Sequence, residues 1–156
     1  MQNRYMTLNR FTLLLLALCL NAYSALALAE GGYGGSNSRL KPYQELIEAD
    51  KFEAAIEMLQ TALAENPDDP DLLNLLAYSQ RKLGKFDAAL ENYLKALERE
   101  PTHRGANEYL GELYLQMDQP EMAEQRLKVL DDDCFFGCRE FDILQQAIAD
   151  YRSKNQ

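Results

Sequence analysis

The side chains best suited to chemistry in this 156-residue sequence are two cysteines that stand four positions apart. Cys134 and Cys138 lie in the segment DDDCFFGCRE, where Gly137 gives the backbone the freedom that a five-residue ring needs. In an exported protein such a pair most simply closes one intramolecular disulfide, and we predict that structural role. A redox-active pair, free thiols and intermolecular bridges are the alternatives. The redox alternative lacks the Cys-x-x-Cys spacing and a strand-helix context.

The sequence predicts no metal, cofactor or catalytic site. A zinc site would need two ligands beyond the cysteines, and His103 alone does not supply them. Covalent haem attachment would need histidine where Arg139 follows Cys138. Asp131 to Asp133 lack the spacing of a calcium loop and are interpreted as a solvated helix end. We place His103 on the surface at the start of a helix, and we predict that the protein is not an enzyme.

The composition is that of one globular domain rather than a disordered chain or a polytopic membrane protein. Apolar residues make up 47% of the sequence and charged residues 26%. Asp and Glu number 25 against 16 Lys and Arg, which gives a formal net charge of -9. A field of that sign repels phosphate backbones, so nucleic acid is excluded as a partner.

Residues 1–29 have the pattern of a signal peptide. Arg4 and Arg10 precede the apolar run FTLLLLALCL, and Ala27-Leu28-Ala29 matches the A-x-A pattern before Glu30. We therefore predict cleavage near Ala29 and a periplasmic or secreted protein that does not contact the membrane after cleavage. The alternative is a membrane anchor formed by an uncleaved signal, since residues 11–29 approach the length that spans a bilayer.

Residues 30–39 follow as a predicted flexible linker. The stretch EGGYGGSNS contains four glycines and no aliphatic residue, so it cannot bury enough surface to order itself.

An internal repeat determines the expected fold. Residues 51–67 read KFEAAIEMLQTALAENP and residues 85–101 read KFDAALENYLKALEREP, with eight of the 17 positions identical at an offset of 34. Apolar residues recur at helical spacing in each unit, and no window alternates as a strand does. Gly84 stands between the two helices of a unit, where a left-handed turn residue is expected. The sequence therefore predicts an all-α chain of helical pairs.

These residues resemble the tetratricopeptide repeat, a helix-turn-helix unit of 34 residues. Repeat two, residues 70–103, matches best, with Leu76, Ala77, Gly84, Phe86, Ala89, Tyr93, Ala96 and Pro101 at signature positions. Repeat three, 104–131, departs from the family at Pro120, and repeat one, 40–69, has a shortened first helix. The resemblance implies a solenoid of about three units in a domain spanning 40–153. Residues 139–153 are predicted as a capping helix.

The resemblance also implies a function and a site. The first helix of each unit lines a concave groove, where five residues are expected to hold a protein or peptide: Asn74, Tyr78, Arg81, Glu108 and Glu112. The basic positions with which chaperone-binding members grip a terminal carboxylate carry Asp71, Leu75, Gly105 and Tyr109 here, so that ligand is not expected. The predicted function is a non-enzymatic adaptor. The alternative is a small thiol-disulfide protein that uses Cys134 and Cys138, and the oligomeric state is not predicted.

The cysteine segment, residues 132–138, resembles the C-terminal end of small exported bacterial members of this family. We expect its disulfide to tie repeat three to the capping helix. Closing the ring is expected to direct Phe135 or Phe136 under residues 139–153, away from the neighbouring aspartates.

The signal peptide gives a direct prediction. If residues 1–29 are cleaved, the exported protein begins at or near Glu30. Mass spectrometry of protein recovered from the cell envelope checks this. Finding Met1–Ala29 intact on that protein would support the membrane anchor instead.

Overall fold

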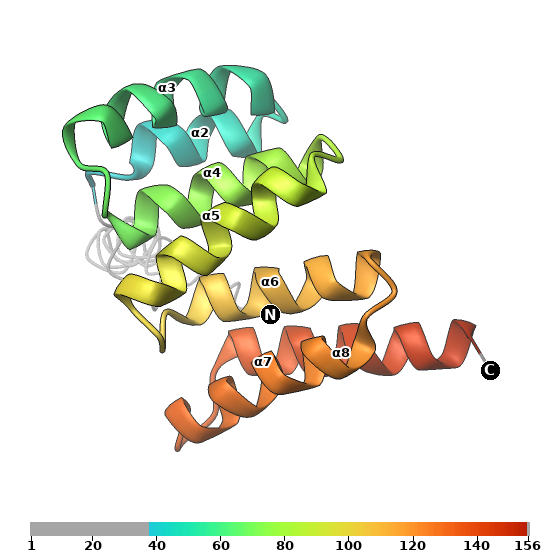
Figure 1. Cartoon of the computed structure of the whole chain (residues 1–156). Coiled ribbons are helices and arrows are strands. Elements are labelled where there is room, and N and C mark those ends of the chain that lie inside the picture. Colours follow the sequence, from blue (N-terminus) through green and yellow to red (C-terminus); the bar gives the residue numbers. More distant parts are fainter. Residues whose placement is uncertain (1–37, 156) are drawn as a thin grey trace, which may run out of the picture. The chain divides into compact units, whose positions relative to one another are not determined.

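The computed structural model describes residues 38–155, and these residues form seven helices and no strand (Figure 1). The helices are α2 (Lys41–Glu48), α3 (Phe52–Glu65), α4 (Pro70–Lys82), α5 (Phe86–Arg99), α6 (Arg104–Gln116), α7 (Pro120–Asp133) and α8 (Arg139–Lys154). The all-α prediction is confirmed. The predicted signal peptide and most of the predicted linker lie outside the described residues. Within residues 38–155, no helix is both long enough and apolar enough to cross a bilayer.

Three turns of one kind close the helical pairs at 34-residue intervals. Asp50, Gly84 and Asp118 have φ angles of 55°, 72° and 60°. At the second turn Gly84 N–H donates to Arg81 O at 2.9 Å, and Lys85 N–H donates to Gln80 O at 2.9 Å. The other two turns repeat this pair of bonds, which is the Schellman pattern. Glycine adopts a positive φ without steric cost and aspartate tolerates it, so the left-handed turn predicted at Gly84 is confirmed.

Alanines recur at the same interval where the helices cross. Ala55, Ala89 and Ala123 have no exposed surface, which lets the helix axes approach closely. Larger side chains such as the fully buried Tyr93 fill the space between units. One buried cluster joins α4 to α8 and a second joins α2, α3 and α4. Because α4 contributes to both clusters, the apolar core continues through the stack.

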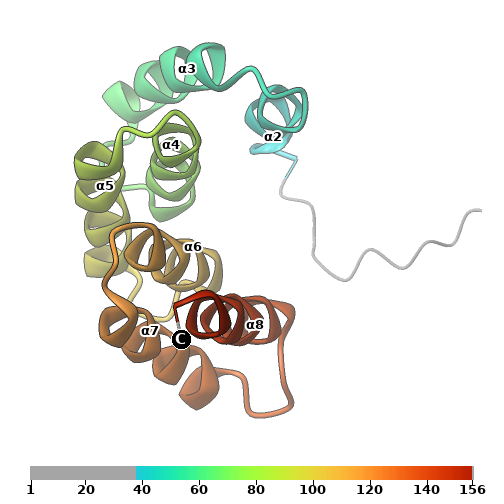
Figure 2. The ribbon, with the colours of Figure 1, turned by 90° about the vertical axis from the view of Figure 1, so that its right-hand side faces the viewer.

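The helices of residues 38–155 form two layers along an arc. Figure 2 shows α2, α4, α6 and α8 on the inner side of the arc and α3, α5 and α7 on its outer side. The first helix of every pair therefore faces inward, and the second faces outward. This is the arrangement of a helical repeat solenoid.

The last helix, α8, packs on both α6 and α7. Leu144 and Ile148 are buried in this contact, and Phe141 packs at its edge. The approach to α6 is closest at Gly111, where a Cβ atom would stand 2.5 Å from Leu144 Cδ2. A side chain at this point would therefore force Leu144 to shift for α8 to dock as it does.

The expected burial of a phenylalanine by the cysteine ring is wrong. Phe135 is 87% exposed and Phe136 is 96% exposed. The ring joins the end of α7 to the start of α8, with the Cα atoms of Cys134 and Cys138 5.6 Å apart. Because both ends of so short a loop are held by helices, its middle residues project outward and cannot fold back under α8.

The ends of the packed unit differ slightly from the predicted boundaries. Arg39, assigned to the linker, forms ion pairs with Asp69 and Asp71, so it belongs to the packed unit. Helix α7 runs to Asp133, two residues beyond the expected end of repeat three. Helix α8 covers the predicted capping helix and extends to Lys154.

The close contact at Gly111 predicts that the effect of Gly111→Ala on the free energy of unfolding differs in sign between the parent and a Leu144→Ala variant. In the parent, Gly111→Ala should lower the free energy of unfolding by about 1–2 kcal/mol, because overpacking outweighs the better helix propensity of alanine. In a Leu144→Ala background the clashing atoms are absent, so the same substitution should be neutral or stabilising. Urea unfolding of the four proteins measures both steps. Equal effects in the two backgrounds would show that Gly111 and Leu144 are not in contact.

Candidate functional site

Four side chains form a cluster on the inner helices α4 and α6. We call Tyr78, Arg81, Tyr109 and Glu112 the inner-face cluster. The two tyrosine rings lie with their centroids 4.8 Å apart. The guanidinium carbon of Arg81 lies 5.3 Å from the centroid of the Tyr78 ring and 5.8 Å from that of Tyr109. Both distances are within the range of a cation–π interaction, so the arginine holds the two rings together.

Arg81 is a buried charge that depends on one carboxylate. Its side chain is 6% exposed, and Nη2 lies 2.7 Å from Glu112 Oε2. Arg81 Nε is buried without a hydrogen-bond partner among the described residues. Removing one member of such a pair commonly costs about 3–5 kcal/mol, because the remaining charge is left buried. We therefore interpret Arg81 as the residue that positions the cluster.

The buried ring of Phe52 on α3 supports the aromatic surface formed by Tyr78 and Tyr109. The Phe52 and Tyr78 rings lie 6.5 Å apart, and Lys82 Nζ lies 5.6 Å from the Phe52 centroid. Tyr78 and Tyr109 are half-buried, so part of each ring meets solvent. This surface can stack on an apolar or cationic group of a ligand.

Glu108 is a carboxyl group with an unusual environment. It is 5% exposed, and burial, followed by repulsion from Glu112 and Glu140, raises its pKa to about 7. Arg139 at the start of α8 and Arg81 oppose this rise in pKa. The inner face thus carries one carboxylate paired with arginine and one whose proton is retained to near neutral pH.

The structure brings together three of the five predicted binding residues: Tyr78, Arg81 and Glu112. Asn74 and Glu108, like Arg81, are more than nine-tenths buried and offer little surface to a ligand. Asn74 lies against Gly105, and its Oδ1 has no hydrogen-bond partner among residues 38–155. The binding role of all five residues stays a prediction.

The surface position expected for His103 is wrong. His103 is the N-cap of α6, where Nδ1 accepts from Ala106 N–H at 3.1 Å. Its Nε2 lies 3.2 Å from Asp71 Oδ1, and its side chain is only 12% exposed. A neutral imidazole satisfies both contacts, because one nitrogen accepts while the other donates. The residue therefore caps a helix and joins two repeats.

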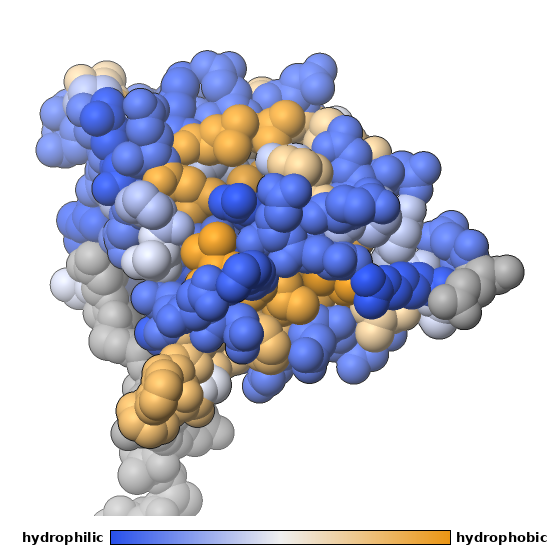
Figure 3. All heavy atoms as spheres, turned by 60° about the horizontal axis from the view of Figure 1, so that its bottom comes forward, coloured by the Kyte–Doolittle hydropathy of each residue, from blue (hydrophilic) through white to orange (hydrophobic). Residues whose placement is uncertain are grey.

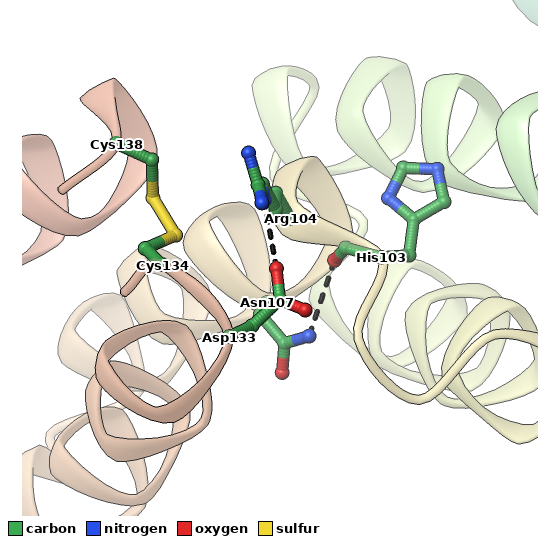
Figure 4. The surroundings of a disulfide bond; sticks show 6 residues. All are labelled: His103, Arg104, Asn107, Asp133, Cys134 and Cys138. Atoms are coloured by element: carbon green, nitrogen blue, oxygen red, sulfur yellow. Dashed lines mark hydrogen bonds and ion pairs between the residues drawn. A yellow bond between two sulfur atoms is a disulfide. The ribbon is translucent and has the colours of Figure 1, made fainter. Parts of the chain in front are cut away.

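Cys134 and Cys138 are joined by a disulfide in the structure. Figure 4 shows this bond beside the ion pair of Arg104 and Asp133, whose Nε and Oδ2 atoms lie 2.8 Å apart. The ion pair links the start of α6 to the end of α7, and the disulfide links the end of α7 to the start of α8. Three helix ends are thereby connected at one corner. Asp133 is engaged there, while Asp131 and Asp132 are exposed, as expected for a helix end.

The described residues contain no group of three or more His, Cys, Asp or Glu side chains that could hold a metal ion. The side chains of the inner-face cluster supply stacking, charge pairing and hydrogen bonding.

The comparison with protein families decides what this architecture is. A family model described as tetratricopeptide repeat matches residues 46–91 and again residues 80–133. The chain belongs to the tetratricopeptide repeat family. No curated protein matches it. The resemblance of the cysteine segment to small exported bacterial members stays a prediction.

A solved structure of the same fold is the crystal structure of a tetratricopeptide repeat protein from Parabacteroides merdae ATCC 43184. The two chains superpose with a TM-score of 0.63 at 20% sequence identity. The match covers 89% of this chain and 52% of the other, so this chain spans about half the length of that tetratricopeptide protein. At this identity the comparison establishes the fold alone.

Tyr109 belongs to the cluster but is not among the binding residues that the sequence predicts. It stands where chaperone-binding tetratricopeptide proteins carry a basic residue. The available signal was the recurrence of aromatic residues on helices that the repeat places side by side.

The raised pKa of Glu108 predicts a pH-dependent stability. Its pKa is about 7 in the folded protein and lies near 4.5 in an unfolded chain. Between these values the folded state binds the proton more tightly, so stability falls as the pH rises from 4.5 to 7. Glu108→Gln removes the free-energy cost of ionising this buried carboxyl group. The variant should be more stable than the parent by roughly 2 kcal/mol at pH 8, after discounting for solvent screening, and equally stable near pH 4.5.

Urea unfolding between pH 4 and pH 8 measures this difference. Glu112→Gln is the matched control, because it removes the partner of buried Arg81 and should lower stability across the range. A constant offset between Glu108→Gln and the parent at every pH would contradict the prediction.

Proposed function

We propose that this tetratricopeptide protein is a non-enzymatic, exported adaptor that holds a protein or peptide segment against the inner face of its helical stack. Tetratricopeptide scaffolds generally serve protein–protein interaction. The observation that supports a site on the inner face is the cluster of Tyr78, Arg81, Tyr109 and Glu112. This cluster combines two half-buried rings, a fixed cation and a carboxylate on adjacent inner helices.

The chemistry of the cluster favours a particular kind of segment. The exposed parts of Tyr78 and Tyr109 bury apolar area at small entropic cost, because each ring is already held by Arg81. The guanidinium is paired with Glu112, so the four residues of the inner-face cluster offer no unpaired cation to a carboxylate. Together with the negative charge of the chain, this favours an extended segment with apolar and basic side chains.

Export is supported by the pattern of residues 1–29 and by the disulfide. Disulfides persist in oxidising compartments such as the bacterial periplasm and are rare in the cytosol. A five-residue ring closed between two helices is consistent with that destination. We therefore place the adaptor in the periplasm or outside the cell.

Thiol-disulfide exchange at the cysteine ring is a second candidate, favoured by one observation. Cys138 is the N-cap of α8, so its sulfur lies at the positive end of the helix dipole. Cys134 is buried, which leaves Cys138 as the sulfur open to attack. The substitutions described next change the inner face and leave both cysteines intact. A loss of peptide binding in those variants is therefore assigned to the inner face and not to the cysteine ring.

The adaptor is tested with a fluorescent peptide selected from a random library on the immobilised protein. Tyr78→Leu combined with Tyr109→Leu keeps apolar bulk but removes the ring faces and hydroxyls. It should weaken binding at least about tenfold, since aromatic anchors dominate such interfaces. Tyr151→Leu on α8 is the matched control and should bind as the parent does. Fluorescence anisotropy gives the affinities, and circular dichroism verifies the fold. Equal affinity of parent and double variant would contradict the inner-face site.

A further inference from the structure

The inner face offers a ligand side chains but no main-chain hydrogen bonds. Every regular element among residues 38–155 is a helix, and a helix bonds its own N–H and C=O groups internally. A ligand therefore cannot add as a strand, because this part of the chain has no sheet edge. Asn74, whose amide could have bonded a ligand backbone, is only 6% exposed. The backbone of a bound segment must hence be bonded within itself, as in a helix, or remain in water.

A helical ligand needs a wide apolar groove, which the inner face lacks. An amphipathic helix buries side chains at i, i+3, i+4 and i+7 in such a groove. The exposed large apolar side chains of the described residues lie elsewhere, on α3, on α5 and in the loop after α7: Met58, Leu94, Phe135 and Phe136. Figure 3, in which the bottom of Figure 1 comes forward, likewise shows apolar residues only in separate areas of a mainly hydrophilic surface. The inner-face cluster instead presents a narrow ledge of two half-buried rings.

A polyproline II segment fits both limits. It has no internal hydrogen bonds and keeps its backbone in water, so it needs no main-chain partner. Proline-rich segments dock on aromatic surfaces and lose little freedom, because their conformation is already formed. We propose that the inner face recognises a proline-rich segment in the polyproline II conformation, with its prolines against the rings of Tyr78 and Tyr109. This inference rests on the proposed adaptor function and names the class of its ligand.

The two tyrosines match such a ligand in shape and in hydrogen bonding. Their ring planes are inclined by 52° with centroids 4.8 Å apart, and Arg81 holds both rings, so the ledge is formed before a ligand arrives. Proline carries a C=O but no N–H, so its backbone only accepts hydrogen bonds. A tyrosine hydroxyl supplies the donor. Burial, followed by the charge of Glu108, raises the pKa of Tyr109 to about 12, so that donor keeps its proton at neutral pH.

A carboxylate beside the tyrosines favours a basic residue next to the prolines. Glu112 lies on the same helix as Tyr109, and its side chain is 28% exposed although it pairs with Arg81. A carboxylate has about four acceptor positions, so this contact leaves room for a second donor. The net charge of the whole chain, -9, acts in the same direction. A lysine or arginine beside the prolines is therefore favoured, and an acidic residue there is repelled.

Two matched libraries of displayed peptides test the class of ligand. One fixes proline at every third position, which places the prolines on one face of a polyproline II helix, and the other fixes alanine there. Both are selected on the immobilised exported protein. Fluorescence anisotropy then gives the affinity of each binder for the parent, for Tyr78→Leu with Tyr109→Leu, and for the control Tyr151→Leu. Binders that lose at least about tenfold in affinity on the double variant alone should come from the proline library and carry a basic residue.

Replacing the fixed prolines of the best such binder by alanine gives the sharper result. With the basic residue kept, this change should weaken binding to the parent at least about tenfold and binding to the double variant much less. Tyrosine-dependent binders that come equally from the alanine library, or that keep their affinity without the prolines, would overturn the polyproline inference and leave the inner-face site standing. If neither library yields a tyrosine-dependent binder, the inner-face site itself fails, and this inference fails with it.

Discussion

The structure depends on one constraint, which is that a single helical pair cannot cover its own apolar faces. Each pair must therefore stack on the next in a fixed register. The register is set by turns that stop the first helix of every pair at the same point, with a left-handed residue at Asp50, Gly84 and Asp118. Ala55 and Ala89 then meet the neighbouring helix at equal positions. The 34-residue period of the sequence follows from this stacking register.

The register also creates the candidate site. Because first helices stack on first helices, side chains from α4 and α6 meet along the inner side of the arc. Arg81 from one repeat then lies within reach of Tyr109 and Glu112 from the next. A buried guanidinium between two rings is stable only with its carboxylate, so the same contact that builds the surface also joins the repeats. Stability and the proposed recognition are therefore coupled at this cluster. Glu108 lies beside it, and burial raises its pKa as well.

The internal repeat made three features predictable from the sequence: the helical pairs, the turn at Gly84 and the burial of Ala89. Identical residues 34 positions apart report equal surroundings, so periodicity carries three-dimensional information without an alignment. His103, Phe135 and Phe136 have no such counterpart. The histidine caps a helix and reaches Asp71 of the preceding repeat, a contact that spacing within one repeat does not reveal. The closed ring was expected to direct one of the two phenylalanines under residues 139–153, but a ring this short between two helix ends leaves both exposed.

The acidic surface limits what the protein can bind. A chain with net charge -9 is repelled by other acidic surfaces, so contacts with them need apolar area that outweighs the repulsion. Among the described residues, the exposed large apolar side chains are Met58, Leu94, Phe135 and Phe136, and the tyrosines of the inner face are half-buried. The inner-face cluster lies on α4 and α6, whereas Phe135 and Phe136 lie beyond the end of α7, so contact at one of these places does not require the other.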